Sequence, residues 1–269
     1  MNKKIGVLGC GWLGFPLARQ LAKNSYDVHG STTSKDKMNA LQLDGITPFQ
    51  IELSETGIKG DIQKFLSNIS ILIINIPPRL RSKNAESYIE KIKLLHAEIK
   101  KSGVSKIIFV SSTSVYGDVK GNVTEFTPPI PNTESGKQLL ACENLLMGDA
   151  TLYTTVIRFG GLIGPQRHPV TMLSGKQNLT NGDDPVNLIH LDDCILMIST
   201  IIQNEYWGEI FNGVYPLHPK KRDYYVDEAK KRDIPPPHYQ NNVLEEKNKV
   251  VLSSLFLGKG HSFTTSITT

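Results

Sequence analysis

Residues 3–23 read KKIGVLGCGWLGFPLARQLAK, and this stretch is the most informative about the fold. Its first part, residues 3–9, is a short apolar run that ends in glycine, which is typical of a fully buried strand. Residues 14–23 carry apolar side chains at helical spacing and predict a helix. The motif Gly9-x-Gly11-x-x-Gly14 therefore lies between a predicted strand and a predicted helix.

In that position the three glycines predict a loop that holds a pyrophosphate. Gly9 permits a tight turn, Gly11 lets the backbone approach the anion, and Gly14 allows close packing of helix on strand. The helix N-terminus then presents N–H groups and a partial positive charge to the anion. Trp12 and Leu13 complete the loop, and we expect Trp12 to pack against the helix start. The alternative is a plain glycine turn.

Strand and helix patterns alternate along the rest of the chain. Strands are predicted at 26–32, 47–53, 70–76, 105–111 and 152–158, and helices at 84–101, 135–147 and 192–203. Asp192 is placed to cap the last of these helices. The alternation predicts an α/β fold, a Rossmann-type doubly wound parallel sheet with a smaller C-terminal substrate lobe.

The chain is expected to divide near residue 165. Residues 1–165 are predicted to form a dinucleotide-binding Rossmann domain, and residues 166–269 the substrate lobe, with 187–212 returning to the core. Residues 164–187 are rich in Gly, Pro, Asn and Gln, which is typical of a long functional loop.

The end of the second strand bears on the choice of cofactor. A carboxylate there would bind a ribose 2′-hydroxyl, but residues 29–35 contain none. Ser31, Thr32 and Lys35 suit a 2′-phosphate instead, so NADP is predicted over NAD. The alternative is a solvated turn followed by a helix cap at Ser34.

The composition excludes several classes of protein. The 269 residues are 39% hydrophobic and 21% charged, which excludes collagen, coiled coils and wholesale disorder. The chain contains no apolar run of about 18 residues, so no membrane span is predicted. The net charge of +4 is diffuse, which fits an anionic small molecule better than nucleic acid. Three distant cysteines form no CxxC pair, so we expect reduced thiols, no metal and a cytoplasmic protein.

Several motifs resemble the extended short-chain dehydrogenase/reductase family, the NAD(P)-dependent epimerase/dehydratases. The resemblance rests on the N-terminal glycine motif, IIFVSSTSVYG at 107–117, VIRFGGLIGP at 156–165, NLIHLDD at 187–193 and IFN at 210–212. GCGWLGFPLA at 9–18, SSTSVYGD at 111–118 and GPQRHP at 164–169 look closest to its YeeZ-like branch. The resemblance implies the Rossmann fold and activity that acts mostly on nucleotide sugars.

One pair of residues departs from the family pattern. The family carries Tyr-x-x-x-Lys on the helix after the SS-x-x-VYG strand, where the lysine lowers the pKa of the tyrosine. Here that helix reads PNTESGKQLLACENLL, which places Ser135 at the tyrosine position and Leu139 at the lysine position. Ser112 matches the family's catalytic hydroxyl but has no matching base. Tyr116 is considered as a substitute acid, against a buried ring with a satisfied hydroxyl.

Further candidates lie at predicted strand ends and in the loop. Pro77, Arg79 and Ser111 are expected to contact the cofactor. The candidates for substrate binding are Ser112, Thr113, Arg158, Arg167 and His168. Each has a structural alternative. Ser112 could instead close its strand by bonding backbone, and Arg158 could pair with a buried carboxylate. Arg167 and His168 could be ordinary solvated charges in the loop.

Two functions of different class remain open. The first is an NAD(P)-dependent oxidoreductase or epimerase-like enzyme with a non-standard site, acting on a small molecule, with nucleotide sugars as the implied class. The second is a dinucleotide-binding redox sensor or scaffold without turnover. The family often pairs through helices equivalent to 84–101 and 135–147, so the resemblance implies a homodimer as one option.

Overall fold

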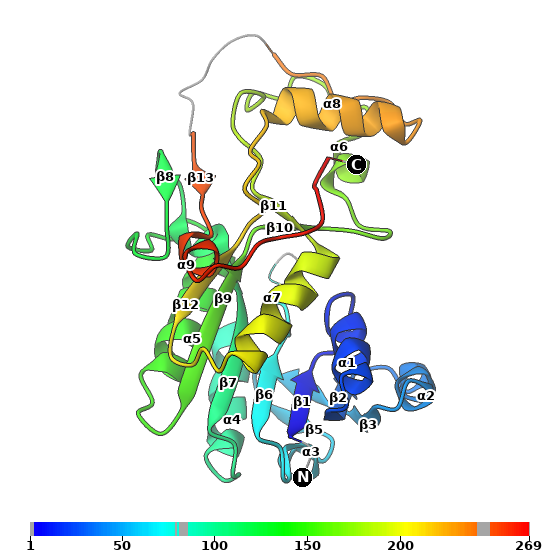
Figure 1. Ribbon diagram of the computed structural model, residues 1–269, viewed down its shortest axis with the longest axis vertical. Coiled ribbons are helices and arrows are strands. Elements are labelled where there is room, and N and C mark those ends of the chain that lie inside the picture. The colour runs from blue at the N-terminus through cyan, green and yellow to red at the C-terminus, as the bar shows by residue number, and fades with distance from the viewer. Residues whose placement is uncertain (1–2, 79, 81–85, 241–247, 269) are drawn as a thin grey trace.

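A seven-stranded parallel sheet forms the centre of the computed structural model, which describes residues 3–78, 80, 86–240 and 248–268 (Figure 1). The strand order is β12-β9-β7-β6-β1-β2-β3, and every neighbouring pair is parallel. These strands are β1 (Lys4–Leu8), β2 (Asp27–Thr32), β3 (Thr47–Gln50), β6 (Ile71–Ile74), β7 (Lys106–Ser112), β9 (Tyr153–Phe159) and β12 (Ile210–Gly213).

Helices cover both faces of this sheet, each over its own apolar core. One core joins α1 (Gly14–Lys23) and α7 (Leu191–Gln203) to the sheet, and the other joins α3 (Ile62–Leu66), α4 (Tyr88–Ile99) and α5 (Glu134–Met147) to it. α2 (Asp36–Leu43) packs on the edge strand β3. Side chains of the buried strands point alternately into the two cores, because successive residues of a strand face opposite sides. The predicted doubly wound Rossmann-type fold is confirmed.

The parallel register brings the carboxyl ends of the central strands to one edge. Leu8 of β1 is opposite Ile74 of β6, and Ile74 is opposite Phe109 of β7. The glycine loop, residues 75–78 and the end of β7 therefore meet at the same place. Ligands of open α/β sheets bind at this edge.

The C-terminal part of the chain lies mostly beyond that edge (Figure 1). α6 (Pro169–Leu173) and α8 (Lys221–Lys231) form a third apolar cluster there, and β10 (Gly161–Ile163) pairs with β11 (Leu188–His190). Within residues 187–212, α7 packs on one face of the sheet and the start of β12 is part of the sheet itself. The domain boundary at residue 165 stays a prediction.

Short elements complete the described residues. They are β4 (Glu52–Ser54), β5 (Gly57–Lys59), the 3-10 helix η1 (Thr113–Tyr116), β8 (Asn122–Val123), β13 (Val250–Val251) and α9 (Ser254–Gly258). Of the helices that the structure describes, none is both long and apolar enough to cross a bilayer.

Two of the differences from the sequence-based expectation are a helix cap and an unpredicted helix. The cap of α7 is His190 and not Asp192, because His190 has extended backbone and its Nδ1 accepts a bond from the Asp192 N–H at 3.3 Å. No helix is predicted at 221–231, yet α8 forms there. Its polar sequence lacks a helical apolar pattern, and burial of Tyr224, Tyr225 and Ala229 in the third cluster holds it in place.

Candidate functional site

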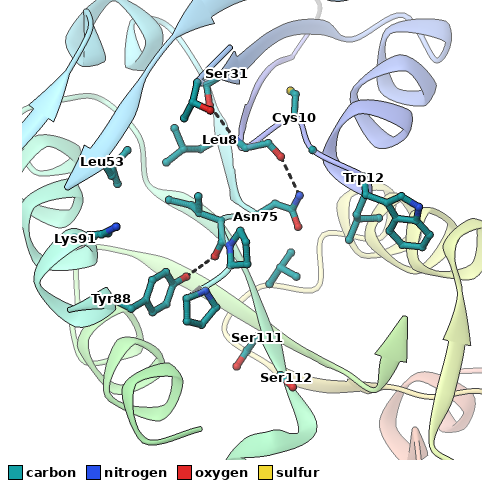
Figure 2. Close-up of a pocket in the computed structure, with 18 of the residues that line it drawn as sticks. Leu8, Cys10, Trp12, Ser31, Leu53, Asn75, Tyr88, Lys91, Ser111 and Ser112 are labelled. Carbon is teal, nitrogen blue, oxygen red and sulfur yellow. Dashed lines mark hydrogen bonds between the residues drawn. The ribbon is translucent and has the colours of Figure 1, made fainter. Parts of the chain in front are cut away.

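A cavity of about 950 Å³ opens at the carboxyl edge of the sheet. Its walls come from the glycine loop, the end of β2, residues 75–78, α4, the end of β7 and residues 159–162. This volume is that of a pocket for a sizeable small molecule. Figure 2 shows side chains from these segments converging on one opening.

The glycine loop is held from two neighbouring strands. Gly9 has a φ of 103°, a conformation that favours glycine. Its N–H donates to the Ser31 hydroxyl at 2.9 Å, and its carbonyl accepts a bond from the Asn75 amide at 3.0 Å (Figure 2). Both contacts fix the path of the loop where it enters the cavity wall.

The three glycines of the motif differ in what they leave room for. A Cβ at Gly14 would lie 2.1 Å from the Gly9 carbonyl oxygen, and a Cβ at Gly9 would lie 2.6 Å from the Asn75 carbonyl oxygen. A Cβ at Gly11 would meet no atom within 4 Å, although Gly11 lines the cavity. The missing side chains at Gly9 and Gly14 thus leave room for neighbouring backbone. The missing side chain at Gly11 leaves open space in front of α1.

The loop after β10 reaches the glycine loop through Trp12. The indole N–H donates to the Pro165 carbonyl at 3.0 Å, and the Arg167 guanidinium carbon lies 4.8 Å from the ring centroid. Trp12, Leu13 and Arg167 all line the cavity. Stacking on an aromatic face orients a guanidinium, so Arg167 presents its charge near the N-terminus of α1.

The end of β2 offers hydroxyl groups and one lysine. Ser31 and Thr32 line the cavity, and the Thr32 hydroxyl accepts a bond from the Ser34 N–H at 3.2 Å. Lys35 is exposed at the start of α2 and lies outside the cavity lining. Lys37, two residues later, lines the cavity instead. The sequence carries no motif that singles out Lys37.

The end of β7 brings two serines to the cavity. The Ser111 hydroxyl donates to the Glu143 carboxylate at 2.5 Å, and the Ser112 hydroxyl accepts a bond from the Ser114 N–H at 3.1 Å. Ser112 therefore caps η1, which is the structural alternative considered for it. Thr113 lies in η1 and outside the lining.

Ser135 and Leu139, the two α5 residues that differ from the family pattern, lie in different surroundings. Leu139 is buried and lines the cavity, so an isobutyl group occupies this part of the wall. Ser135 is half-buried in the first turn of α5 and lies outside the lining. Of the cofactor candidates after β6, Pro77 lines the cavity, and Arg79 lies outside the described residues.

Arg158 is placed in the protein interior and not in the cavity wall. Its Nη2 lies 2.6 Å from the Glu143 carboxylate and its Nη1 donates to the Tyr116 hydroxyl at 3.0 Å. The Tyr116 hydroxyl in turn donates to Asn212 at 2.8 Å, and burial raises the pKa of Tyr116. Arg158 thus follows the buried-carboxylate alternative, and Tyr116 is a packed ring with a satisfied hydroxyl.

His168 also lies in a buried contact set. Its Nε2 is 3.0 Å from the Tyr224 hydroxyl, and its Nδ1 accepts a bond from the Val170 N–H at 3.2 Å. Burial, aided by the nearby Arg232 charge, lowers the pKa of His168 to about 4. The ring is neutral at pH 7 and caps α6, so the structure places it away from the cavity that Arg167 lines.

Besides Lys37, the lining residues that the sequence-based reasoning missed include Asn75, Tyr88 and Lys91. Asn75 lies near the carboxyl end of the strand predicted at 70–76, and that position is the signal that could have found it. Tyr88 and Lys91 lie three residues apart on α4. The Tyr88 hydroxyl donates to the Ile76 carbonyl at 2.8 Å (Figure 2), and burial raises the pKa of Tyr88 well above its usual value. Lys91 lies in a helix whose apolar pattern indicates only a core face, so no sequence signal singles it out.

Within the described ranges, no three His, Cys, Asp or Glu side chains are grouped to hold a metal ion.

Comparison with known proteins agrees with this geometry. The sequence model of the NAD dependent epimerase/dehydratase family matches residues 5–212. Protein YeeZ of Escherichia coli strain K12 is 34% identical over 250 residues, which cover 93% of this chain and 91% of YeeZ.

Solved structures share the fold. A putative NAD-dependent epimerase/dehydratase from Methylobacillus flagellatus is 26% identical, with a TM-score of 0.74 over 98% of this chain and 93% of its own. UDP-glucuronic acid 4-epimerase from Bacillus cereus, in complex with UDP-glucuronic acid and NAD, is 20% identical, with a TM-score of 0.77 over 97% and 95%. The resemblance found in the sequence is confirmed: the chain belongs to the NAD dependent epimerase/dehydratase family.

Proposed function

We propose that the cavity binds a nicotinamide dinucleotide and that the protein is an NAD(P)-dependent oxidoreductase or epimerase-like enzyme with a non-standard proton-transfer site. The observation that carries this proposal is the open space in front of Gly11. A backbone without a side chain there, at the start of a ten-residue helix, suits a pyrophosphate. Membership of the family supports the same ligand class.

The adenosine half of the dinucleotide is proposed to lie on the β2 side of the cavity. Ser31 and Thr32 contribute hydroxyl groups there, and Lys37 contributes a cation. Glu52 also lines this side, but its carboxylate lies 3.6 Å from the Lys59 ammonium. We therefore propose NADP as the preferred cofactor, with Lys37 beside Lys35 as the source of positive charge, and NAD as the weaker one.

The nicotinamide half is proposed to lie toward Ser111 and Ser112, with the substrate beyond it. Ser112, Thr113 and Arg167 are the candidates for substrate contact. The Bacillus cereus neighbour holds UDP-glucuronic acid, which supports a nucleotide sugar as the substrate class. Arg158 and His168 are left out of this site because their polar atoms bond within the protein.

Bound nicotinamide supplies hydride transfer, and the chain must then supply a proton donor or acceptor. Ser135 and Leu139 cannot form a tyrosine–lysine pair, and Leu139 places an apolar group in the cavity wall. A positioned acid or base contributes roughly 10²–10⁴-fold in rate. We therefore expect slow turnover of nucleotide sugars.

A second function, a non-catalytic dinucleotide-binding sensor or scaffold, is favoured by one observation. The Ser112 hydroxyl accepts a backbone bond at the start of η1, so the matched catalytic hydroxyl already has a structural use. Turnover measurements separate this function from the first.

The test begins with titration of the wild-type protein with NADP(H) and NAD(H), followed by turnover of a panel of nucleotide sugars and simple carbonyl compounds. Ser135→Tyr alone should change turnover little, since Leu139 leaves the tyrosine pKa high. Ser135→Tyr with Leu139→Lys should raise it. The matched control, Ser135→Tyr with Ala141→Lys, puts the lysine at an exposed position of α5 outside the lining and should not.

Thermal melts of each variant verify that the helix tolerates the changes. Binding of neither dinucleotide by the wild type would refute the proposed function. Robust wild-type turnover that Ser135→Ala abolishes would make the serine itself catalytic and contradict the non-standard-site hypothesis.

A further inference from the structure

We propose that Lys91 is a ligand-binding residue of the cavity, which leaves Glu86 and contacts a phosphate group of the dinucleotide when the dinucleotide binds. This inference rests on the proposed function and adds a cation that the family's sequence pattern does not indicate. The contact would be made from α4, across the cavity from the glycine loop that is proposed to hold the pyrophosphate.

The side chain of Lys91 is largely covered. It is 20% exposed, whereas Lys93 of the same helix is 53% exposed and Lys100, which follows the helix, is 40% exposed. Lysines are mostly exposed in proteins, and a covered one normally has a specific partner. Lys91 lines the cavity, and Figure 2 shows its amine directed from α4 toward the opening.

The backbone below Lys91 is fixed by two other parts of the site. The Tyr88 hydroxyl donates to the Ile76 carbonyl at 2.8 Å, and the Tyr88 N–H donates to the Gln138 side chain at 2.6 Å. The first turn of α4 is thus tied to the end of β6 and to α5. Lys91 follows one turn later, where residues share a helix face, so its stem starts from a fixed point beside the cavity.

Lys91 lies on the side of the cavity proposed for adenosine. α4 packs against β4, and Leu53 of β4 lines the cavity next to Lys91 in Figure 2. Among the described lining residues, the cations are Lys37 on α2, Arg167 in the loop after β10 and Lys91 on α4. They come from three different segments. The lining carboxylates Glu52 and Glu86 are already paired, with Lys59 and Lys91, so the cations suit a ligand that carries several phosphate charges.

Glu86 is the group that a ligand must replace. Its carboxylate lies 2.5 Å from the Lys91 ammonium, and this bond lowers the pKa of Glu86, so the carboxylate is ionised at neutral pH. The Glu86 side chain is 40% exposed, so water can solvate it once the lysine has moved. Water screens the pair on its Glu86 side, and a phosphate can therefore compete for the ammonium.

The position also bears on Leu139. α5 contributes a leucine where the family carries a lysine, and α4, which packs on α5, contributes Lys91 to the same cavity. Lys91 lies on the proposed adenosine side of the cavity, so it does not take the place of the family's lysine at Leu139.

Isothermal titration with NADP, NAD and ADP tests the proposal in the full chain. Lys91→Met keeps the apolar stem and removes the charge, and it should raise the Kd of all three ligands by roughly fivefold. The matched control is Lys93→Met, because Lys93 is also on α4 and pairs with Glu90 at 2.8 Å but lies outside the lining. It should leave the Kd unchanged.

Glu86→Gln removes the competing carboxylate and should lower the Kd, and the Lys91→Met effect should shrink as salt is raised. Equal Kd values for Lys91→Met and Lys93→Met, with a wild type that binds, would overturn the role of Lys91 alone. A wild type that binds none of the three ligands would overturn the proposed function instead, so the two failures are distinguishable.

Discussion

The two halves of the cavity are built by different means. On the glycine-loop side, the walls depend on backbone: the turn at Gly9, the open face at Gly11 and the close packing at Gly14. On the β7–α5 side, they depend on side chains, with Ser111 bonded to Glu143 and Leu139 filling the wall.

This difference explains why the two halves diverge unequally from the family pattern. A backbone-built site needs glycines at fixed spacing and tolerates change elsewhere. A side-chain-built site loses its chemistry when one residue type changes, even though the helix that carries it keeps its place. α5 still packs on the sheet and on α4, while Ser135 and Leu139 no longer offer a tyrosine and a lysine.

Gly11→Val gives the largest expected effect on cofactor binding and tests the backbone-built half. The new side chain would enter the space in front of α1 and exclude the pyrophosphate, so affinity for NADP and NAD should fall roughly 100-fold or more. Fluorescence titration of the reduced cofactors measures this loss. Gly103→Val is the matched control, since a Cβ there also meets no atom within 4 Å and Gly103 lies outside the cavity. Unchanged affinity in Gly11→Val would show that the loop does not hold a dinucleotide.

Glu143→Gln tests the side-chain-built half. The change leaves the buried Arg158 guanidinium without its carboxylate, and breaking a buried pair costs about 3–5 kcal/mol in the free energy of unfolding. Ser111→Ala removes the hydroxyl and leaves the ion pair, so it should cost only about 1 kcal/mol. Urea unfolding of both variants measures the difference. A Glu143→Gln protein as stable as Ser111→Ala would mean that the ion pair does not support this wall.

The third prediction compares two adjacent residues, Arg167 and His168, through the pH dependence of stability. Arg167 is exposed at the cavity, whereas His168 is buried with its pKa lowered to about 4. The unfolded histidine takes up a proton near pH 6.5 and the folded one only near pH 4. Stability should therefore fall as pH drops from about 6.5 to 4, because the unfolded state binds more protons in that interval.

His168→Asn keeps a capping acceptor and removes this titration. The fall in unfolding free energy between pH 6.5 and 4 should be smaller than in the wild type by about 2–3 kcal/mol. Burial also lowers the pKa of His218, so some slope should remain in both proteins. Identical pH profiles would contradict the buried, neutral state of His168.

Most of the sheet could be predicted because its signals are local. The helix at 14–23 is found as predicted, and the strands before and after it shift by one or two residues. The apolar runs at 70–76 and 105–111 also become strands, and the helix at 84–101 is shorter at both ends. Such patterns arise because a strand or helix buries one or both of its faces, and the spacing of apolar residues within the segment shows this without reference to the rest of the chain.

The sequence is enough to predict the glycine loop, its place between strand and helix, and the parallel α/β class. It also nominates Arg167, Arg158 and His168, but only the packed fold separates them: Arg167 faces the cavity with Lys37 and Lys91, whereas Arg158 and His168 face the interior. A periodic pattern reports that a side chain is buried or exposed, but whether its neighbour is a cavity or a buried carboxylate depends on segments far away in the chain. Glu143 for Arg158 and Tyr224 for His168 are such partners, and they meet only when the sheet and its helices have packed.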